Sequence, residues 1–328
     1  IIMAVKTTPE YIDLLNQAVE REFGVAVQYF LQHAKMEKII KKQIPENILF
    51  DKTTYDAVGK MLHEISIQEM KHAASIMERI YYLGGEATTK GGKPVIGNTI
   101  SEFAKLGVVA EEEALNLYRK IIGKAAEMGD WETREMFEKI YGEEEEHLFK
   151  FQEYKAFQDE KEEPDKVPLS EWRKIFTPDY YELLNKAVAA EICGIIQYTN
   201  QHEKAASLEL RMKKTPLESI QGTNYQGVVS KLLKDVFMAE MQHLEKISER
   251  IYLVDGEAVT KPNPLPVVGK TTLEILCLDH QLEADTIALY RQIIAEAMKR
   301  GDTTTRRIFE DIVLQEEDHY WTFDDYVR

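Results

Sequence analysis

The sequence has little that could crosslink the chain, anchor it in a membrane or bind nucleic acid. Only Cys193 and Cys277 among its 328 residues are cysteines, so neither a disulfide framework nor a thiolate metal site is expected. No apolar run approaches the ~18 residues of a transmembrane helix, and a signal-peptide core is absent from the first residues. A net charge of −16 disfavours nucleic acids and anionic membranes as partners. These absences favour a cytoplasmic protein that binds neither nucleic acid nor a membrane.

The second half of the sequence repeats the first at an offset of 169 to 172 residues. Thr8–Tyr11 reads Thr-Pro-Glu-Tyr, and Thr177–Tyr180 reads Thr-Pro-Asp-Tyr. A hydroxyl cap, a proline at the first helical position and an acid in the first turn are typical of a helix start. The chain is long enough for two domains that each bury a core. A tandem duplication is therefore expected, with domains at 1–157 and 178–328 and a linker at 158–177.

Apolar periodicity predicts four long amphipathic helices in each half. They cover residues 9–41, 54–83, 98–128 and 131–157, then 178–213, 225–254, 271–300 and 303–326. The connection between the second and third helices could reach at most ~48 Å when extended. A helix of about 30 residues is ~45 Å long, so this connection can run the length of a bundle. The expected fold is all-α, with two tandem four-helix bundles arranged up-down-down-up and one long crossover in each.

Four of the eight histidines follow a glutamate three residues earlier, and each pair has a lone glutamate upstream. Residues i and i+3 share a helix face, so Glu-x-x-His can direct a carboxylate and an imidazole at one metal. One glutamate from each of two helices, with Glu-x-x-His from each of two others, is the di-metal pattern of ferritin-like bundles. The predicted metal ligands are Glu22, Glu69, His72, Glu111, Glu144 and His147, then Glu191, Glu240, His243, Glu283, Glu316 and His319.

The composition of this ligand set favours iron. Four carboxylates per half would neutralise two buried Fe(II) ions. Mixed oxygen and nitrogen ligands suit iron or manganese, whereas structural zinc usually takes four ligands in a closed site. A single Glu-x-x-His could simply decorate a solvated helix face, but four of them at matching offsets argue against that alternative. Two di-iron centres are expected, with manganese as the alternative metal.

Tyrosines occupy the same inward helix faces as the predicted ligands. Tyr29 and Tyr198 lie seven residues, about two turns, after the glutamates of their helices. Each is interpreted either as a catalytic residue, through a hydrogen bond or one-electron donation, or as a core aromatic. Other residues near these stripes are interpreted as core or incidental: Tyr118, Tyr290, His33, His202 and His280.

The segments that carry these motifs resemble the bacterioferritin family. Residues 66–73, Ser-Ile-Gln-Glu-Met-Lys-His-Ala, are similar to its second helix, and Glu22 with Gln28–Phe30 to its first. The acidic run Glu143–His147 is similar to its fourth helix. The resemblance covers most of each half and implies two tandem ferritin-like bundles packed as an intramolecular pseudo-dimer. Rubrerythrins are less similar, because Ala114 and Thr286 stand where they carry a further ligating glutamate.

The resemblance implies roles for individual residues. Glu69 and Glu144 would bridge two irons in the first half, and the equivalent pair in the second half is Glu240 and Glu316. The other predicted ligands would be terminal. The family also binds haem between two subunits through a methionine from each. Met70 and Met241, which directly follow bridging glutamates, would be the axial ligands of a haem held between the two domains.

Three departures from the family pattern bear on assembly. Tyr29 and Glu69 lie further apart than in the family, which predicts an enlarged first loop in both halves. The sequence stops at Arg328 without a short fifth helix, and two domains are fused. These departures argue against a closed storage cage, although a homo-oligomer is compatible with them.

The expected function is a di-iron ferroxidase that oxidises Fe(II) with O2 or H2O2, for iron handling or storage or for oxidative-stress defence. Two alternatives share the same ligands. One is a non-storing, rubrerythrin-like peroxidase or oxidase, and the other is a protein that holds manganese or zinc statically.

Overall fold

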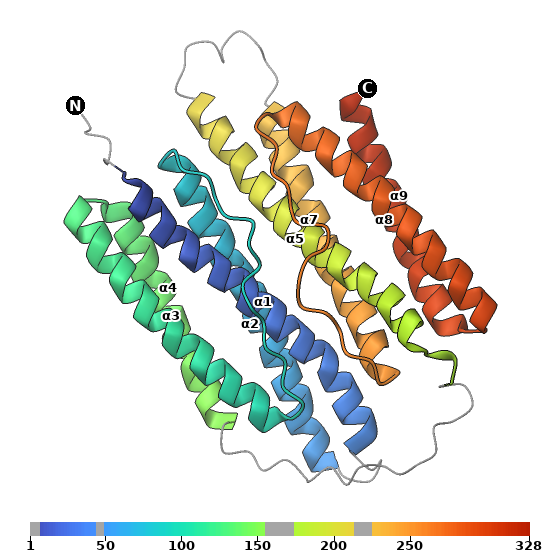
Figure 1. The fold of residues 1–328 in the computed structure, drawn as a ribbon. Helices are drawn as coiled ribbons and strands as arrows, with labels where there is room; N and C mark the ends of the chain where they lie inside the picture. Colours follow the sequence, from blue (N-terminus) through green and yellow to red (C-terminus); the bar gives the residue numbers. More distant parts are fainter. Residues whose placement is uncertain (1–6, 44–48, 155–173, 213–224) are drawn as a thin grey trace. The chain divides into compact units, whose positions relative to one another are not determined.

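Each half of the chain forms a bundle of four long helices in the computed structural model (Figure 1). The structure describes residues 7–43, 49–154, 174–212 and 225–328. The chain divides into two units, Ile1–Glu162 and Glu163–Arg328. Most of the expected linker, residues 158–177, lies outside the described residues.

The helices follow the segments expected from the periodicity. The first unit contains α1 (Pro9–Gln43), α2 (Leu49–Tyr82), α3 (Ile100–Met128) and α4 (Trp131–Tyr154). The second contains α5 (Pro178–Met212), α7 (Tyr225–Leu253), α8 (Thr272–Arg300) and α9 (Thr303–Val327). Over the described ranges there is no β-strand, and the expected all-α fold of two four-helix bundles is confirmed.

Local sequence signals set the ends of the third helices. The Thr99 hydroxyl accepts a hydrogen bond of 3.2 Å from the backbone N–H of Glu102, which caps α3. Thr271 caps α8 in the same way. Gly129 and Gly301 follow the two helices with φ values of 69° and 73°, a left-handed conformation that glycine adopts without strain. The sharp turns into α4 and α9 depend on them.

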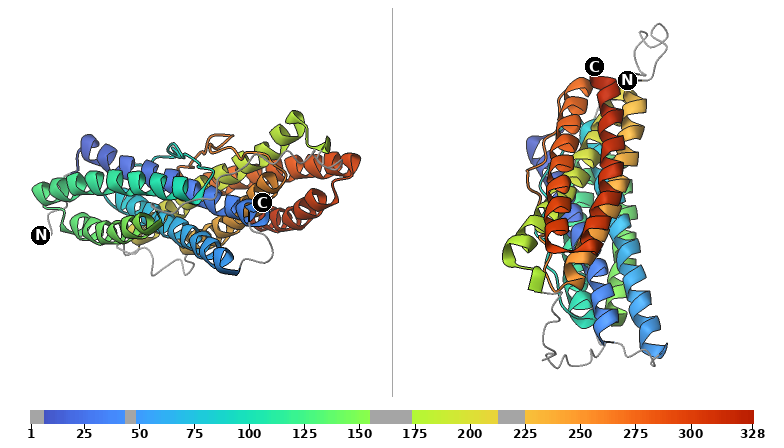
Figure 2. Two further views of the ribbon diagram at one scale, coloured as in Figure 1. Left: turned by 90° about the horizontal axis from the view of Figure 1, so that it is seen from below. Right: turned by 90° about the vertical axis from the view of Figure 1, so that its right-hand side faces the viewer.

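A long crossover connects α2 to α3 and runs along α1 (Figures 1 and 2). Asn16 donates a hydrogen bond of 3.0 Å to the carbonyl of Glu86, and Gln28, about three turns further along α1, accepts one of 3.0 Å from the N–H of Val95. The contacts advance along both segments together, so the crossover is parallel to α1. Helix α3 therefore starts beside the C-terminal part of α1, where Lys35 donates a 2.8 Å hydrogen bond to Asn98, which gives the up-down-down-up order.

Glycine allows the crossover to approach α1 closely. A Cβ at Gly92 would lie 2.6 Å from the carbonyl oxygen of Glu20 and 2.8 Å from Cα of Gly24, and its φ is 64°. The second unit uses the same route, where Gln197 on α5 accepts a 3.0 Å hydrogen bond from the N–H of Val267.

A buried ion pair joins α1, α2 and the start of α4. The guanidinium of Arg79 pairs with Asp130, which also accepts hydrogen bonds from the hydroxyls of Tyr11 at 3.0 Å and Thr133 at 2.6 Å. The second unit repeats this cluster with Arg250, Asp302, Tyr180 and Thr305. In each unit this cluster fixes the positions of the helices relative to one another along the bundle axis.

The expected enlarged first loop is wrong for the first unit. Helix α1 continues to Gln43 and α2 begins at Leu49, so the additional residues lengthen the two helices instead of the loop. The stretch from residue 37 to 43 holds no glycine or proline, and Pro45 follows the last helical residue closely, as is typical of a helix stop. The corresponding segment of the second half, residues 213–224, lies outside the described part.

In the part of the chain that the structure describes, no helix is both long and apolar enough to cross a membrane.

Candidate di-metal sites

The predicted ligands of each half meet in the interior of one bundle. In the first unit, α1 supplies Glu22, α3 supplies Glu111, and the two Glu-x-x-His pairs come from α2 and α4. All six residues are buried, with at most 4% exposure. They form two overlapping groups whose ligand atoms lie within 4.8 Å of one another, each holding three carboxylates and one histidine. The structure thus brings together the residues that the spacing selected.

Two carboxylates of the first unit each face both histidines. Glu69 places Oε2 3.3 Å from Nδ1 of His72 and Oε1 3.1 Å from Nδ1 of His147. Glu144 places Oε1 3.1 Å from His72 and Oε2 3.4 Å from His147. Each carboxylate therefore directs one oxygen toward each of two positions, as a group that bridges two metal ions must.

The second unit repeats this arrangement. Glu240 places Oε2 3.6 Å from Nδ1 of His243 and Oε1 3.4 Å from Nδ1 of His319. The two oxygens of Glu316 lie 3.1 Å and 3.2 Å from the same nitrogens. Glu283 approaches His319 to 3.8 Å. The two units share one ligand geometry although their sequences have diverged.

Several buried atoms of these sites lack a hydrogen-bond partner. Within the described residues, both carboxylate oxygens of Glu144 and both ring nitrogens of His147 and His243 make no hydrogen bond. Buried polar atoms normally find partners, because an unpaired group loses its hydration without compensation. Carboxylate oxygens and imidazole nitrogens are also ligands that iron and manganese accept. The orphaned atoms fit two metal ions in each bundle.

The charges of the first site are also unbalanced. Burial raises the pKa of Glu22 and Glu111 well above the usual range, and repulsion from Glu69 and Glu144 adds to it. Burial and Glu69 act in the same direction on Glu144, but Arg21 and the two histidines outweigh them and lower its pKa to about 2. The carboxylates outnumber the cationic groups, so additional positive charge would favour ionisation of all four.

Buried tyrosines donate hydrogen bonds to three of the predicted glutamate ligands. The hydroxyl of Tyr29 donates a hydrogen bond to Oε1 of Glu111, and that of Tyr198 donates one of 2.5 Å to Oε1 of Glu283. Tyr290, interpreted from the sequence as a core residue, is buried and donates to Glu191. Three buried phenols are therefore in direct contact with predicted ligands.

Two charged residues at the first site were missed by the sequence analysis. Arg21 reaches the ligand carboxylates, and its Nη2 lies 2.7 Å from Glu111. Glu143 lies 2.7 Å from Nε2 of His72, the ring nitrogen opposite the one that faces the ligands. Both directly precede a predicted ligand. A comparison of the halves could have found them, since Ala190 and Gln315 stand at the equivalent positions.

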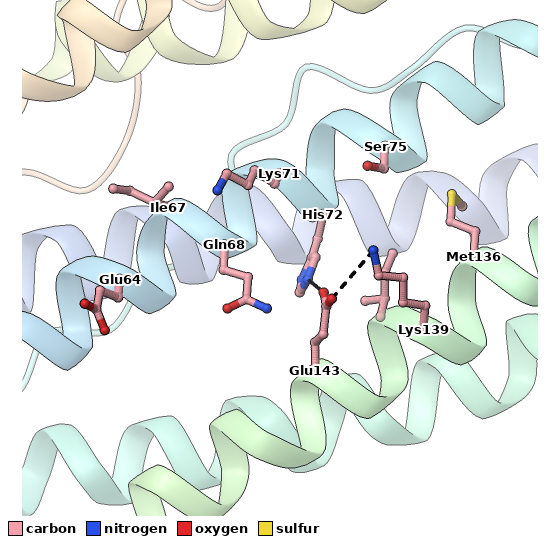
Figure 3. Close-up of a pocket in the computed structure, with 10 residues that line it drawn as sticks. Glu64, Ile67, Gln68, Lys71, His72, Ser75, Met136, Lys139 and Glu143 are labelled. Atoms are coloured by element: carbon pink, nitrogen blue, oxygen red, sulfur yellow. Dashed lines mark hydrogen bonds and ion pairs between the residues drawn. The ribbon is translucent and has the colours of Figure 1, made fainter.

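Glu143 and His72 line an open cavity of about 530 Å³ between α2 and α4 (Figure 3). Lys139, one turn before Glu143, places its ammonium 3.9 Å from the Glu143 carboxylate. A carboxylate behind a ligating histidine fixes the ring orientation and raises its basicity. Glu143 is placed to do this for His72.

The remaining predicted residues lie outside the ligand clusters. His33 and His202, interpreted from the sequence as core histidines, are half-buried, and their Nδ1 atoms lie 2.8 Å and 2.5 Å from backbone carbonyls of the second helices. His280 pairs with Asp324 at 3.2 Å. Met70 and Met241 are 5% and 3% exposed. They belong to different units, and their role as haem ligands stays a prediction.

Comparison with known proteins places the chain in a family. The model of the ferritin-like domain matches residues 12–156 and again 219–328, together well over half of the sequence. The chain belongs to the ferritin-like family. Bacterioferritins are among its relatives. That of Desulfovibrio desulfuricans is 33% identical over 138 residues, covering 42% of this chain and 68% of the relative. That of Brucella melitensis is 26% identical over 144 residues, covering 44% and 81%. The recognised bacterioferritin resemblance and the tandem ferritin-like duplication are confirmed.

Solved structures of bacterioferritins also match this ferritin-like chain. The Desulfovibrio desulfuricans protein, whose di-iron site has been described in different catalytic states, is 27% identical, with a TM-score of 0.39 and coverage of 48% of this chain and 82% of that one. The Rhodobacter capsulatus protein, described with a metal-free dinuclear site and a haem iron, is 28% identical, with a TM-score of 0.39 and coverage of 45% and 84%.

Proposed function

We propose that each bundle binds two iron ions and that the protein is a ferroxidase, which oxidises Fe(II) with O2 or H2O2. The observation that carries this proposal is the paired orientation of the bridging carboxylates, in which Glu69 and Glu144 each direct one oxygen toward each histidine. Glu240 and Glu316 do the same in the second unit. The bacterioferritins among its sequence relatives support the choice of iron.

The ligands divide into two roles. Glu69 and Glu144 would bridge the ions, Glu22 and His72 would complete one coordination shell, and Glu111 with His147 the other. In the second unit, Glu240 and Glu316 would bridge, with Glu191 and His243, and Glu283 and His319, as terminal ligands. A bound iron pair supplies the two electrons that reduce the oxidant.

The side chains around the ligands position them and exclude water. Tyr29 and Tyr198 each hold one terminal glutamate by a hydrogen bond, and we propose that they fix its rotamer while iron binds. Burial of every ligand in the first unit limits the access of water to the reaction.

Aerobic Fe(II) titration, followed by sizing and iron counting, tests the proposal. A rapid burst that saturates near four irons per chain, about two per bundle, is the expected result. Iron that remains at this ratio after repeated additions identifies a cycling oxidase or peroxidase, whereas hundreds of irons per particle identify storage. Tight metal binding without any Fe(II) oxidation would overturn the ferroxidase and leave a static manganese or zinc site.

A further inference from the structure

The two sites share six ligands but differ in a buried cation. Arg21 directly precedes Glu22 on α1, whereas Ala190 directly precedes Glu191 on α5. The Arg21 side chain is only 12% exposed. No arginine or lysine of the second unit forms an ion pair with its ligand carboxylates within the described residues, and only the histidines do.

Arg21 approaches all four ligand carboxylates of its bundle. Its Nη1 lies 3.2 Å from Glu22, 3.9 Å from Glu69 and 3.8 Å from Glu144. Its Nη2 lies 2.7 Å from Glu111 and also donates a 2.9 Å hydrogen bond to the carbonyl of Ala110. The guanidinium is thus held by the backbone of α3 as well as by the ligands.

The tyrosine on the third helix of each bundle has a different partner because only the first bundle contains this arginine. In the second unit Tyr290 donates its hydroxyl hydrogen bond directly to Glu191. In the first unit the equivalent Tyr118 instead accepts a hydrogen bond of 3.4 Å from Nη1 of Arg21. The guanidinium therefore lies between Tyr118 and the first-helix glutamate.

A guanidinium and a metal ion need the same oxygens. Arginine is permanently charged, has five donors in a rigid planar fork and accepts no metal. A carboxylate oxygen that neutralises it in a buried site is less available to a divalent cation, and two cations at close range repel each other. Metal can enter only if the guanidinium withdraws or shares these oxygens.

We propose that Arg21 makes the first bundle the weaker metal site, so that the second bundle fills first and the first bundle fills only when Arg21 leaves the carboxylates. The inference rests on the proposed di-metal function and assigns the two bundles unequal affinities for divalent cations. Arg21 acts here as a positioning residue, because it contacts the ligands and not the reacting oxidant.

Titration with Co2+ tests this without any turnover, because its visible bands report binding directly. Each bundle is examined separately by disabling the other, with Glu240→Ala and His243→Ala to isolate the first and Glu69→Ala and His72→Ala to isolate the second. The first-site protein also carries Glu143→Gln, which matches Gln315 of the second unit. In this matched pair the isolated first site should bind Co2+ at least ~10-fold more weakly than the second, a difference of about 1.4 kcal/mol.

Matched substitutions at positions 21 and 190 then test whether Arg21 causes this difference in affinity. Arg21→Ala in the first-site protein should tighten binding by at least ~10-fold, and Ala190→Arg in the second-site protein should weaken it by a similar factor. Arg21→Gln, which keeps much of the side-chain volume without the charge, should also tighten binding at the first site. It replaces the alanine variant if that variant folds poorly. The helical circular dichroism of each variant checks the fold.

The outcomes separate the two proposals. Equal affinities of the isolated sites, or a first site that Arg21→Ala and Arg21→Gln leave unchanged, would overturn the competition while leaving the di-metal function intact. Failure of the folded, otherwise unaltered protein to bind Co2+ or Fe(II) at all would overturn the di-metal function, and the competition with it.

Discussion

Tyr198 donates a 2.5 Å hydrogen bond to Oε1 of Glu283, and both side chains are buried. The acceptor is a predicted terminal ligand on α8, while the donor comes from α5. Burial and repulsion by Glu316 and Glu240 raise the pKa of Glu283, and Tyr198 partly opposes them. The phenol therefore stabilises the charged form of the ligand.

Removal of this hydroxyl should destabilise the second bundle. Tyr198→Phe leaves a buried carboxylate oxygen without its donor, at a cost of about 1–3 kcal/mol. Tyr29→Phe, which removes the equivalent bond to Glu111, is the matched variant for the first bundle. Denaturant unfolding of the apo protein measures both, and unchanged midpoints would show that the two bonds contribute nothing.

Loss of one bridging carboxylate should abolish Fe(II) oxidation in one bundle only. Glu69→Ala removes a ligand that faces both histidines of the first unit, while every ligand of the second unit remains. About half of the stoichiometric Fe(II) oxidation burst should persist at saturating Fe(II). Glu240→Ala is the reciprocal variant. A full burst from Glu69→Ala would mean that the first bundle is idle.

Glu143 should strengthen metal binding through His72. Its carboxylate lies 2.7 Å from Nε2, so Glu143→Gln loses the charged partner and should weaken metal binding at the first site by ~10–100-fold. Gln315 is the natural counterpart, and Gln315→Glu should tighten the second site. Co2+ titration of single-site proteins measures both changes. A first site that Glu143→Gln does not weaken, or a second site that Gln315→Glu does not tighten, would refute the role.

Acid should weaken the contact that joins α1, α2 and α4. Burial acts to raise the pKa of Asp130, but the hydrogen bonds from Thr133 and the charge of Arg79 outweigh it and hold the pKa below its usual range. A depressed folded pKa contributes stability that is present above the unfolded value of about 3.9 and is lost as the pH falls through the folded value.

Asp130→Asn should therefore lower stability at neutral pH and reduce its fall below about pH 4. The free energy of unfolding, measured against pH for apo protein with and without the substitution, provides the check. Parallel curves for the two proteins would show that Asp130 does not contribute to the acid dependence.

A haem held by Met70 and Met241 should give the protein a Soret band after expression with ample haem. Two thioether ligands are chemically suited to haem iron, and both methionines are buried. Met70→Leu combined with Met241→Leu should remove the band while Fe(II) oxidation persists. A colourless protein, or a band that survives both substitutions, would leave these methionines as packing residues.

The fold could be predicted closely because its signals are local. Helix periodicity, the Thr-Pro-acid starts and the glycines at 129 and 301 placed the helix ends, and the i, i+3 spacing selected ligands that the bundles bring together. The first loop was predicted wrongly because family spacing located an insertion without showing whether it continues a helix.

Arg21 and Glu143 could not be predicted from spacing. Each directly precedes a ligand, and a neighbouring helical residue points about 100° away from it. Arg21 reaches the carboxylates only because its side chain is long and an α3 carbonyl holds its tip. Such a contact depends on the distance between helices, which a one-dimensional pattern does not contain.

The fusion of two bundles in one polypeptide has a genetic consequence. In an assembly of identical subunits, a substitution beside one site appears beside every site, so specialisation is impossible without a second gene. Here a single codon change at position 21 or 190 alters the site of one bundle and leaves the site of the other bundle unchanged. Each translated molecule carries one centre of each kind, in a ratio that expression level and subunit exchange cannot alter.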